Sequence, residues 1–111
     1  MAEPSARTRS VRTVPRFVKS KRRLPDAIQE EVDAQVRRLT ENPLSGEPKV
    51  GALKGVRVVK FKVDVHQYLL AYQFFPKQKV IEILGVGVHE NFYRDLQSYL
   101  NSDRGVRSRQ L

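Results

Sequence analysis

VRVVKFKVDVHQYLLAYQFFPKQKVIEILGVGV, residues 56–88, is the stretch that decides the fold of this 111-residue chain. It contains three runs rich in Val, Ile, Leu, Tyr and Phe, and short polar breaks at 64–67 and 76–79 separate them. This pattern is typical of three consecutive β-strands joined by tight connections. We therefore expect a three-strand meander on which the rest of the chain packs.

The first of these runs has two different faces. Along it, Val59, Phe61 and Val63 alternate with Val58, Lys60 and Lys62. Because successive side chains of a strand point to opposite faces, the two lysines share one face and the first apolar set shares the other. The pattern predicts a sheet with a covered back and a basic front.

The flanking segments predict a short strand and three helices. Residues 11–14 suit a strand at the sheet edge, which Pro15 ends because proline lacks an amide donor. A short helix can follow over 17–23. The segment from Pro25 to Asn42 favours a second helix, and a loop follows over 43–48. The apolar residues at helical spacing in the second helix are Ile28, Val32, Val36 and Leu39.

A final helix is expected after the meander. Asn91 can cap it, and it runs to about Leu100, with Phe92, Leu96 and either Tyr99 or Leu100 forming one apolar stripe. The expected fold class is α+β, with a mostly antiparallel sheet formed by the N-terminal strand and the meander. The two N-terminal helices pack on one face, and the C-terminal helix is short.

The chain is strongly basic, and its charge is unevenly distributed. It has 21 Lys and Arg against 12 Asp and Glu, a formal charge of +9. Residues 1–23 hold eight Lys or Arg against Glu3, residues 24–48 two against six acids, and residues 49–79 seven against Asp64. This asymmetry favours a polyanionic partner such as RNA, DNA or an acidic protein, the alternative being a basic surface that only aids solubility.

Composition also excludes several classes of site. The chain has no cysteine and two histidines, so it lacks thiolate chemistry and the usual four-ligand zinc site, and we expect no metal and no cofactor. It has no apolar run long enough to span a bilayer and no secretory signal, so we expect no membrane contact and a cytoplasmic location. We expect one domain over 11–101, between flexible basic tails over 1–10 and 102–111.

Five segments in this order resemble the RelE/ParE superfamily of bacterial toxins from type II toxin–antitoxin systems, the RelE-like branch above all. They are PRFVKSKRRLP at 15–25, LTENPLSG at 39–46, LKGVRVVKFKV at 53–63, YLLAYQF at 68–74 and GVGVHENFYRDL at 85–96. The resemblance implies a toxin that cuts mRNA in the ribosomal A site without metal, by attack of the ribose 2′-OH on the adjacent phosphate. Its implied partners are the ribosome, mRNA and a cognate antitoxin that neutralises it.

The resemblance also suggests the catalytic residues. Lys60 and Lys62 fall where the RelE-like branch has a basic pair, His89 falls where many members have an arginine, and Tyr93 lies near the family's C-terminal tyrosine. The chain departs from the family on the middle strand, where the frequent Tyr-Arg-x-x-Tyr pattern has Leu69 in place of the arginine.

The chemistry of these side chains fits the implied reaction. Cleavage needs a base, cations at the phosphate and an acid for the leaving oxygen. Lys60 and Lys62 lie about 7 Å apart along a strand, so they can clamp one phosphate, and either can serve as the base. His89 can donate a proton at neutral pH, and Tyr93 can stack on a base. Each of these residues also has a purely structural alternative. The lysines can simply lie on a solvent-exposed face of the sheet, the histidine can cap a helix, and the tyrosine can pack in the core.

Three further cations are candidate phosphate contacts, which position RNA without reading its sequence. They are Lys54, Arg57 and Arg94. His66 falls in an expected turn, and we assign it no role.

Two other functions fit the sequence. The first is a ParE-like toxin that inhibits DNA gyrase without cutting nucleic acid, or an inactive member that only binds an antitoxin. The second is a small domain that binds nucleic acid through its arginine-rich ends.

Overall fold

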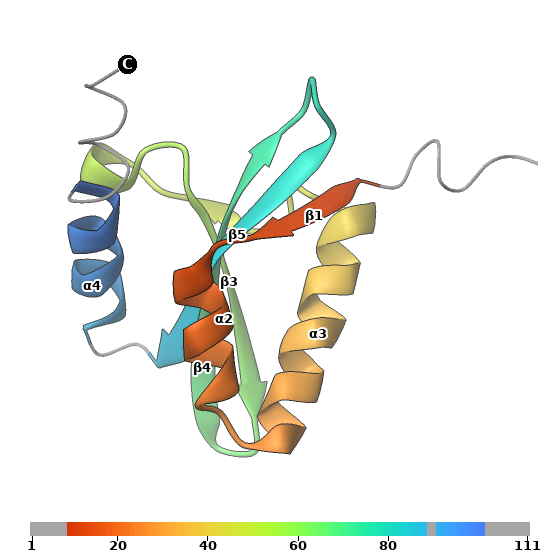
Figure 1. Cartoon of the computed structure of the whole chain (residues 1–111), viewed down its shortest axis with the longest axis vertical. Helices are drawn as coiled ribbons and strands as arrows, with labels where there is room; N and C mark the ends of the chain where they lie inside the picture. Colours follow the sequence, from red (N-terminus) through yellow and green to blue (C-terminus); the bar gives the residue numbers. More distant parts are fainter. Residues whose placement is uncertain (1–8, 89–90, 102–111) are drawn as a thin grey trace, which may run out of the picture.

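The computed structural model describes residues 9–88 and 91–101, and Figure 1 shows their arrangement. A strand, two helices, a very short strand and a 3₁₀ turn occupy the first half, and the meander follows. In chain order the elements are β1 (Ser10–Thr13), α2 (Pro15–Arg22), α3 (Asp26–Glu41), β2 (Glu47–Pro48), the 3₁₀ turn η1 (Gly51–Leu53), β3 (Arg57–Val63), β4 (His66–Phe75), β5 (Val80–Val88) and α4 (Phe92–Tyr99).

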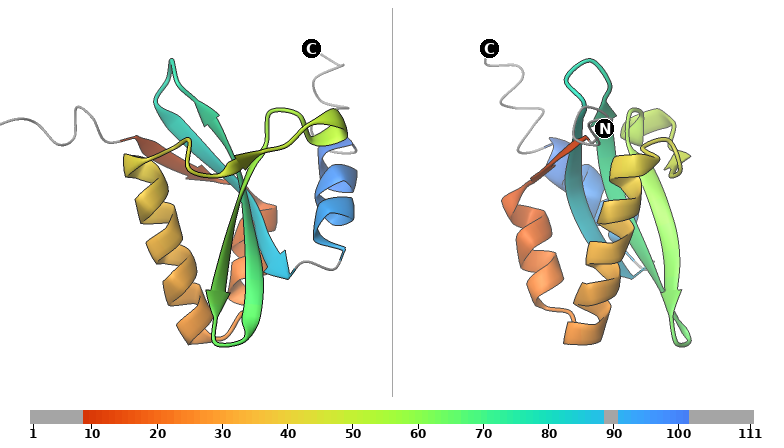
Figure 2. Two further views of the ribbon diagram at one scale, coloured as in Figure 1. Left: turned by 180° about the vertical axis from the view of Figure 1, so that it is seen from behind. Right: turned by 90° about the vertical axis from the view of Figure 1, so that its right-hand side faces the viewer.

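The five strands form one sheet in the order β1-β5-β4-β3-β2. The pair β1 and β5 is parallel, and the other three pairs are antiparallel. Figures 1 and 2 show α3 and α4 on opposite sides of this sheet. The expected α+β fold with a mostly antiparallel sheet is therefore confirmed.

The first connection of the meander is tighter than the sequence indicated, whereas the second lies at 76–79 as predicted. The predicted break over 64–67 is wrong, because β4 already begins at His66 and pairs it with Val63. Asp64 adopts a φ of 58°, the left-handed conformation that aspartate tolerates better than most residues. The turn of this hairpin therefore has only two residues, and His66 lies in β4.

The basic face of the sheet is partly covered, which corrects the expected division into a core face and a basic face. Val58 shares a face with Lys60 and Lys62, yet it is only 2% exposed. Helix α4 packs on this face, where a Cβ built on Gly87 would lie 3.4 Å from the Phe92 ring. The core thus extends to both sides of the sheet. Its residues with no exposed surface are Val32, Val56, Leu69, Leu70, Ala71, Tyr72, Ile81, Ile83, Leu84 and Leu96.

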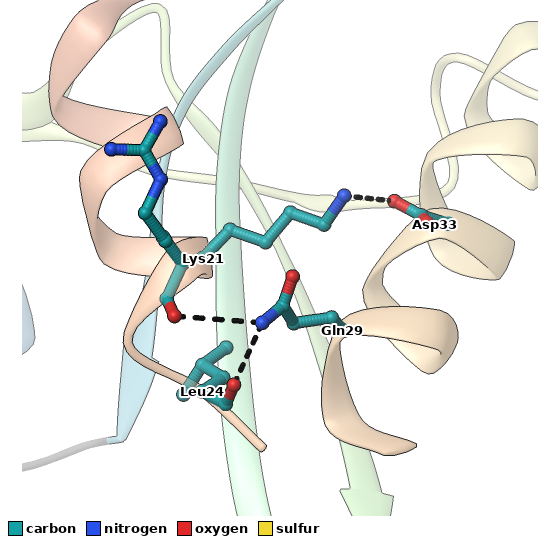
Figure 3. Close-up of polar contacts among 5 residues, drawn as sticks. Lys21, Leu24, Gln29 and Asp33 are labelled. Carbon is teal, nitrogen blue, oxygen red and sulfur yellow. Dashed lines mark hydrogen bonds and ion pairs between the residues drawn. The ribbon is translucent and has the colours of Figure 1, made fainter. Parts of the chain in front are cut away.

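Helices α2 and α3 are held together by polar contacts (Figure 3). The Lys21 ammonium lies 2.6 Å from the Asp33 carboxylate. The Gln29 side-chain amide donates to the carbonyl of Leu24 at 2.8 Å, and to that of Arg22 at 3.5 Å. These contacts fix which side of α2 faces α3 and which side remains outside.

Both edge strands are short. β1 has four residues, and Arg12 on it forms an ion pair with Glu82 of β5 at 3.2 Å. β2 has two residues within the segment predicted to be a loop, and that prediction is wrong there. The sequence did not predict this strand because it contains Pro48. Proline lacks the amide donor expected in a strand and is tolerated mainly at sheet edges.

Tyr72 of β4 forms hydrogen bonds to the loop after α3. Its hydroxyl donates to the carbonyl of Pro43 at 2.7 Å and accepts from the amide of Gly46 at 2.9 Å. A Cβ on Gly46 would lie 2.7 Å from the Tyr72 ring, so glycine is needed for this close approach. Burial raises the pKa of Tyr72 above its ordinary value of 10.0, although the Gly46 amide and Arg57 oppose this shift.

We expect Tyr72→Phe to lower the free energy of unfolding by about 1–3 kcal/mol, because a buried amide and a buried carbonyl lose their partner. Since the native pKa of Tyr72 is raised, its contribution is fully present below the unfolded pKa and is lost as the pH rises through the native value. Urea unfolding between pH 8 and pH 11 would measure both effects.

Tyr68→Phe is the matched control, because no hydrogen bond of the Tyr68 hydroxyl occurs among the described residues. Equal losses of stability in the two variants would contradict the role of the Tyr72 hydroxyl.

Candidate functional site

Lys60 and Lys62 project from the same face of β3, and both side chains are exposed. Lys60 pairs with Leu69 of β4, and Lys62 pairs with Gln67. Neither ammonium has an ion pair within residues 9–88 and 91–101. The structure thus brings together two solvent-facing cations whose charge is available to an anionic ligand.

Leu69 occupies the position where the family resemblance places an arginine, and it is completely buried. It pairs with Lys60 on one side and with Gly87 on the other, so it lies between them on the face that α4 covers. The Phe92 ring packs over Gly87. The basic pair therefore borders an apolar surface at this position, where the side chain is a leucine and not a cation.

Tyr93 lies at the start of α4 beside a lysine that the sequence analysis missed. The Lys49 ammonium lies 5.0 Å from the centre of the Tyr93 ring, and Phe92 meets the ring edge-on at 5.5 Å. Burial alone would lower the pKa of Lys49, but its contacts with Tyr93 and Glu47 outweigh burial and raise it. Tyr93 is thus packed against the core and is also in contact with a cation.

Two of the three candidate phosphate contacts, Arg57 and Arg94, form hydrogen bonds to other residues of the chain. Arg57 lies on the opposite face of β3 from Lys60, and its guanidinium donates to the carbonyls of Leu44 at 3.2 Å and Gly46 at 2.7 Å. Arg94 is exposed on α4 and donates to the Asn91 side chain at 2.8 Å.

Lys54, the third, is exposed at the end of η1. Among the predicted site residues that the structure describes, only Lys60 and Lys62 lie together on one face of the sheet.

The cap expected from Asn91 takes a different form. Asn91 precedes α4, but it has a φ of 64° and its side chain makes no capping hydrogen bond to the helix backbone. The side chain accepts from Arg94 instead. The left-handed conformation, which asparagine tolerates, explains this difference.

His89 lies outside the described residues, so its role as a proton donor stays a prediction. No group of three or more His, Asp or Glu side chains suited to a metal ion occurs in the described ranges. Within the same ranges, no helix is long and apolar enough to cross a bilayer.

Comparison with known proteins decides the family. Residues 11–97 match the model of the ParE-like toxins of type II bacterial toxin–antitoxin systems. The chain belongs to this family. No curated protein sequence matches it.

Solved structures share the fold of this ParE-like toxin. The RelBE2 toxin–antitoxin complex of Mycobacterium tuberculosis matches with a TM-score of 0.66 and 23% identity, over 74% of this chain and 92% of that one. A mutant of the E. coli toxin RelE in the free state matches with a TM-score of 0.66 and 19% identity, over 82% and 92%. The archaeal RelE–RelB complex of Pyrococcus horikoshii matches with a TM-score of 0.56 and 21% identity, over 75% and 97%.

These findings confirm the resemblance to the RelE/ParE superfamily. The structures reported above all contain RelE toxins, as expected for a RelE-like fold. In the ParE-like toxin described here, the exposed lysines of β3, buried Leu69 and the Lys49–Tyr93 contact are the features from which its activity can be argued.

Proposed function

We propose that this ParE-like toxin is a ribosome-dependent mRNA endonuclease that inhibits translation in the bacterial cytoplasm. The observation that carries the proposal is the exposure of Lys60 and Lys62 on one face of β3, with no ion pair in the described ranges. Two adjacent ammonium groups suit the charge that gathers on a phosphate during cleavage.

In this mechanism the ribose 2′-OH attacks the adjacent phosphorus, and the bond to the 5′ oxygen of the next nucleotide breaks. One of Lys60 and Lys62 accepts the 2′-OH proton in its neutral form, and the other stabilises the phosphate. His89 donates a proton to the leaving oxygen. The products are a cyclic phosphate and a free 5′-OH, and the balance requires neither metal nor cofactor.

Tyr93 is proposed to bind an RNA base by stacking. Its ring is in contact with Lys49, so a base that stacks on that side must displace the ammonium. Lys54 and Arg94, both exposed, are proposed to contact flanking phosphates. Arg57 can join them only if it leaves the carbonyls of Leu44 and Gly46.

The proposed protein partner is a cognate antitoxin. Two of the similar structures are complexes of RelE toxins with their antitoxins, which supports an equivalent complex here. Mixed charge along the chain, with an acidic α3 beside basic segments, also suits binding to another protein.

A second function is supported by Leu69. A buried leucine replaces the arginine expected from the RelE-like pattern, and the matching family model is that of ParE-like toxins. Both observations fit a toxin that inhibits DNA gyrase, or an inactive member that only binds an antitoxin. Neither alternative gives the exposed lysine pair a role in catalysis.

Cell-free translation of a reporter mRNA with purified toxin, followed by primer extension, tests the proposal. We expect cuts that appear only when the message is translated, and that weaken in a His89→Gln variant. A known RelE nuclease serves as the positive control. If that control cuts and the present toxin does not, the nuclease function is wrong, and inhibition of gyrase supercoiling is the next assay.

A further inference from the structure

Lys49 lies on the face of the sheet that carries the lysine pair of β3. Glu47 of β2 pairs with Val58, which shares a face with that pair, and side chains two residues apart in an extended segment point the same way. The backbone amide of Lys49 donates to the carbonyl of Val56 at 2.9 Å, so the extended pairing continues to Lys49. Its contact with Tyr93 agrees with this placement, because α4 covers the same face.

Lys49 and the lysine pair are far enough apart to bind different phosphates of one RNA strand. Val56, opposite Lys49, precedes Lys60 by four residues, which is roughly 13 Å along an extended strand. An RNA strand covers this distance in a few nucleotides. Tyr93, the proposed stacking residue, is in contact with Lys49, so a nucleotide bound at the ring brings a phosphate near the ammonium.

The Lys49 ammonium is held in place, whereas its ion-pair partner is exposed. The Lys49 side chain is only 22% exposed and lies 5.0 Å from the centre of the Tyr93 ring. The carboxylate of Glu47 lies 3.5 Å from the ammonium, and the Glu47 side chain is 61% exposed. A long ion pair with an exposed carboxylate is weak. Glu47 can therefore give way to an anionic ligand at little cost.

The protonation of Lys49 suits binding of a phosphate and not proton transfer. Burial lowers the pKa of Lys49, but its contacts with Tyr93 and Glu47 outweigh burial and raise the pKa above its ordinary value of 10.5. Lys49 therefore stays protonated near neutral pH and cannot act as a base.

We propose that Lys49 binds the phosphate of the nucleotide that stacks on Tyr93, and that Glu47 competes with this phosphate for the ammonium. Lys49 thereby positions the RNA strand relative to the lysine pair of β3 and takes no part in proton transfer. The inference rests on the proposed function, because it extends the same RNA-binding face. Neither Lys49 nor Glu47 is among the residues that the family resemblance suggested.

The test measures binding of RNA to the full-length toxin by fluorescence anisotropy. The probe is a labelled 2′-O-methyl oligouridylate of about eight nucleotides, which lacks the attacking hydroxyl and stays intact. We expect Lys49→Gln to weaken binding about tenfold. The dependence of log affinity on log salt concentration should become less steep by about 0.7, the value for one phosphate contact with a single strand. Lys49→Arg should restore both quantities, because it keeps the charge.

Glu47→Gln is expected to act in the opposite direction. It removes the carboxylate that competes for Lys49, so the probe should bind about threefold more tightly or better. Combined with Lys49→Gln, it should have no such effect, because the two changes act on one interaction and are not additive. Since Glu47 is exposed, this variant keeps the proposal testable if Lys49→Gln does not fold.

Lys77→Gln and Glu30→Gln are the matched controls, because each makes the same change of charge at an exposed position, in the turn after β4 and on α3. The proposal is overturned if Lys49→Gln and Lys77→Gln lose equal affinity, or if Glu47→Gln gains no more than Glu30→Gln. It is also overturned if the wild type does not bind at about 1 mM RNA. A lower melting temperature of Lys49→Gln with unchanged salt dependence would show that Lys49 only stabilises the packing of α4, and would overturn it too.

Cleavage of translated mRNA separates this proposal from the proposed function. Lys49→Gln should raise the toxin concentration needed for half-maximal cleavage about tenfold and lower the maximal rate much less, because the phosphate at Lys49 does not react. A toxin that binds the probe through Lys49 but cuts no translated mRNA refutes the nuclease function alone. A toxin that cuts mRNA, but whose RNA binding and cleavage do not respond to Lys49→Gln, refutes the role of Lys49 alone.

Discussion

Lys60→Ala/Lys62→Ala is expected to lower the rate of translation-dependent mRNA cleavage by roughly 100-fold or more. The variant removes both exposed cations of β3, and with them the proposed base and the charge that stabilises the phosphate. Its stability should change little, because both side chains are exposed and have no ion pair in the described ranges. Primer extension after cell-free translation, at several toxin concentrations, measures the rate.

Arginine variants at the same positions separate the two roles of the lysines. Arginine keeps the positive charge but stays protonated, so it can hold a phosphate and cannot act as the base. We expect one of Lys60→Arg and Lys62→Arg to lose most activity and the other to retain most of it.

Arg37→Ala/Lys77→Ala controls for loss of charge at exposed positions elsewhere. Cleavage that falls equally in this control and in Lys60→Ala/Lys62→Ala would show that net charge, and not the lysine pair, governs activity.

Leu69→Arg is expected to destabilise the protein by about 3 kcal/mol or more, although it restores the residue type typical of the RelE-like pattern. Leu69 has no exposed surface, and α4 covers the face on which it lies. A guanidinium there would lose water without gaining a partner. Such a loss is a large fraction of the total stability of a small domain, and urea unfolding measures it.

Leu69→Met is the matched control, since it keeps the volume and apolar character and should cost less than about 1.5 kcal/mol. If Leu69→Arg is as stable as the wild type and cleaves mRNA faster, α4 does not cover this position in solution, and the position can accept a catalytic cation. A large loss of stability shows that Leu69 belongs to the core and that this position cannot hold a catalytic cation.

Much of the fold could be predicted because it depends on local patterns. The alternation around Val59 and Phe61 indicated a half-buried strand, and the helical spacing of Ile28, Val32 and Leu39 indicated an amphipathic helix. All three of Ile28, Val32 and Leu39 are buried in the structure. Lys60 and Lys62 were placed on a common exposed face by the same argument, since strand periodicity alone fixes it.

The rest of the site depends on contacts between distant parts of the chain. No local sequence pattern indicates that α4 covers Leu69. Nor does any indicate that Lys49, which follows β2, contacts Tyr93 in α4. Arg57 looked like a free cation, but the loop after α3 supplies carbonyls to its guanidinium. The partners of these side chains are set by tertiary packing, which periodicity and composition do not report.

The short edge strands also bear on how the protein avoids aggregation. The long apolar strands β4 and β5 lie inside the sheet, and the outermost positions go to the four residues of β1 and the two of β2. Such edges offer few backbone groups to another chain, and Pro48 and Arg12 make them poorer still as templates for intermolecular pairing. The short edges thereby oppose pairing between the sheets of two copies of this basic protein.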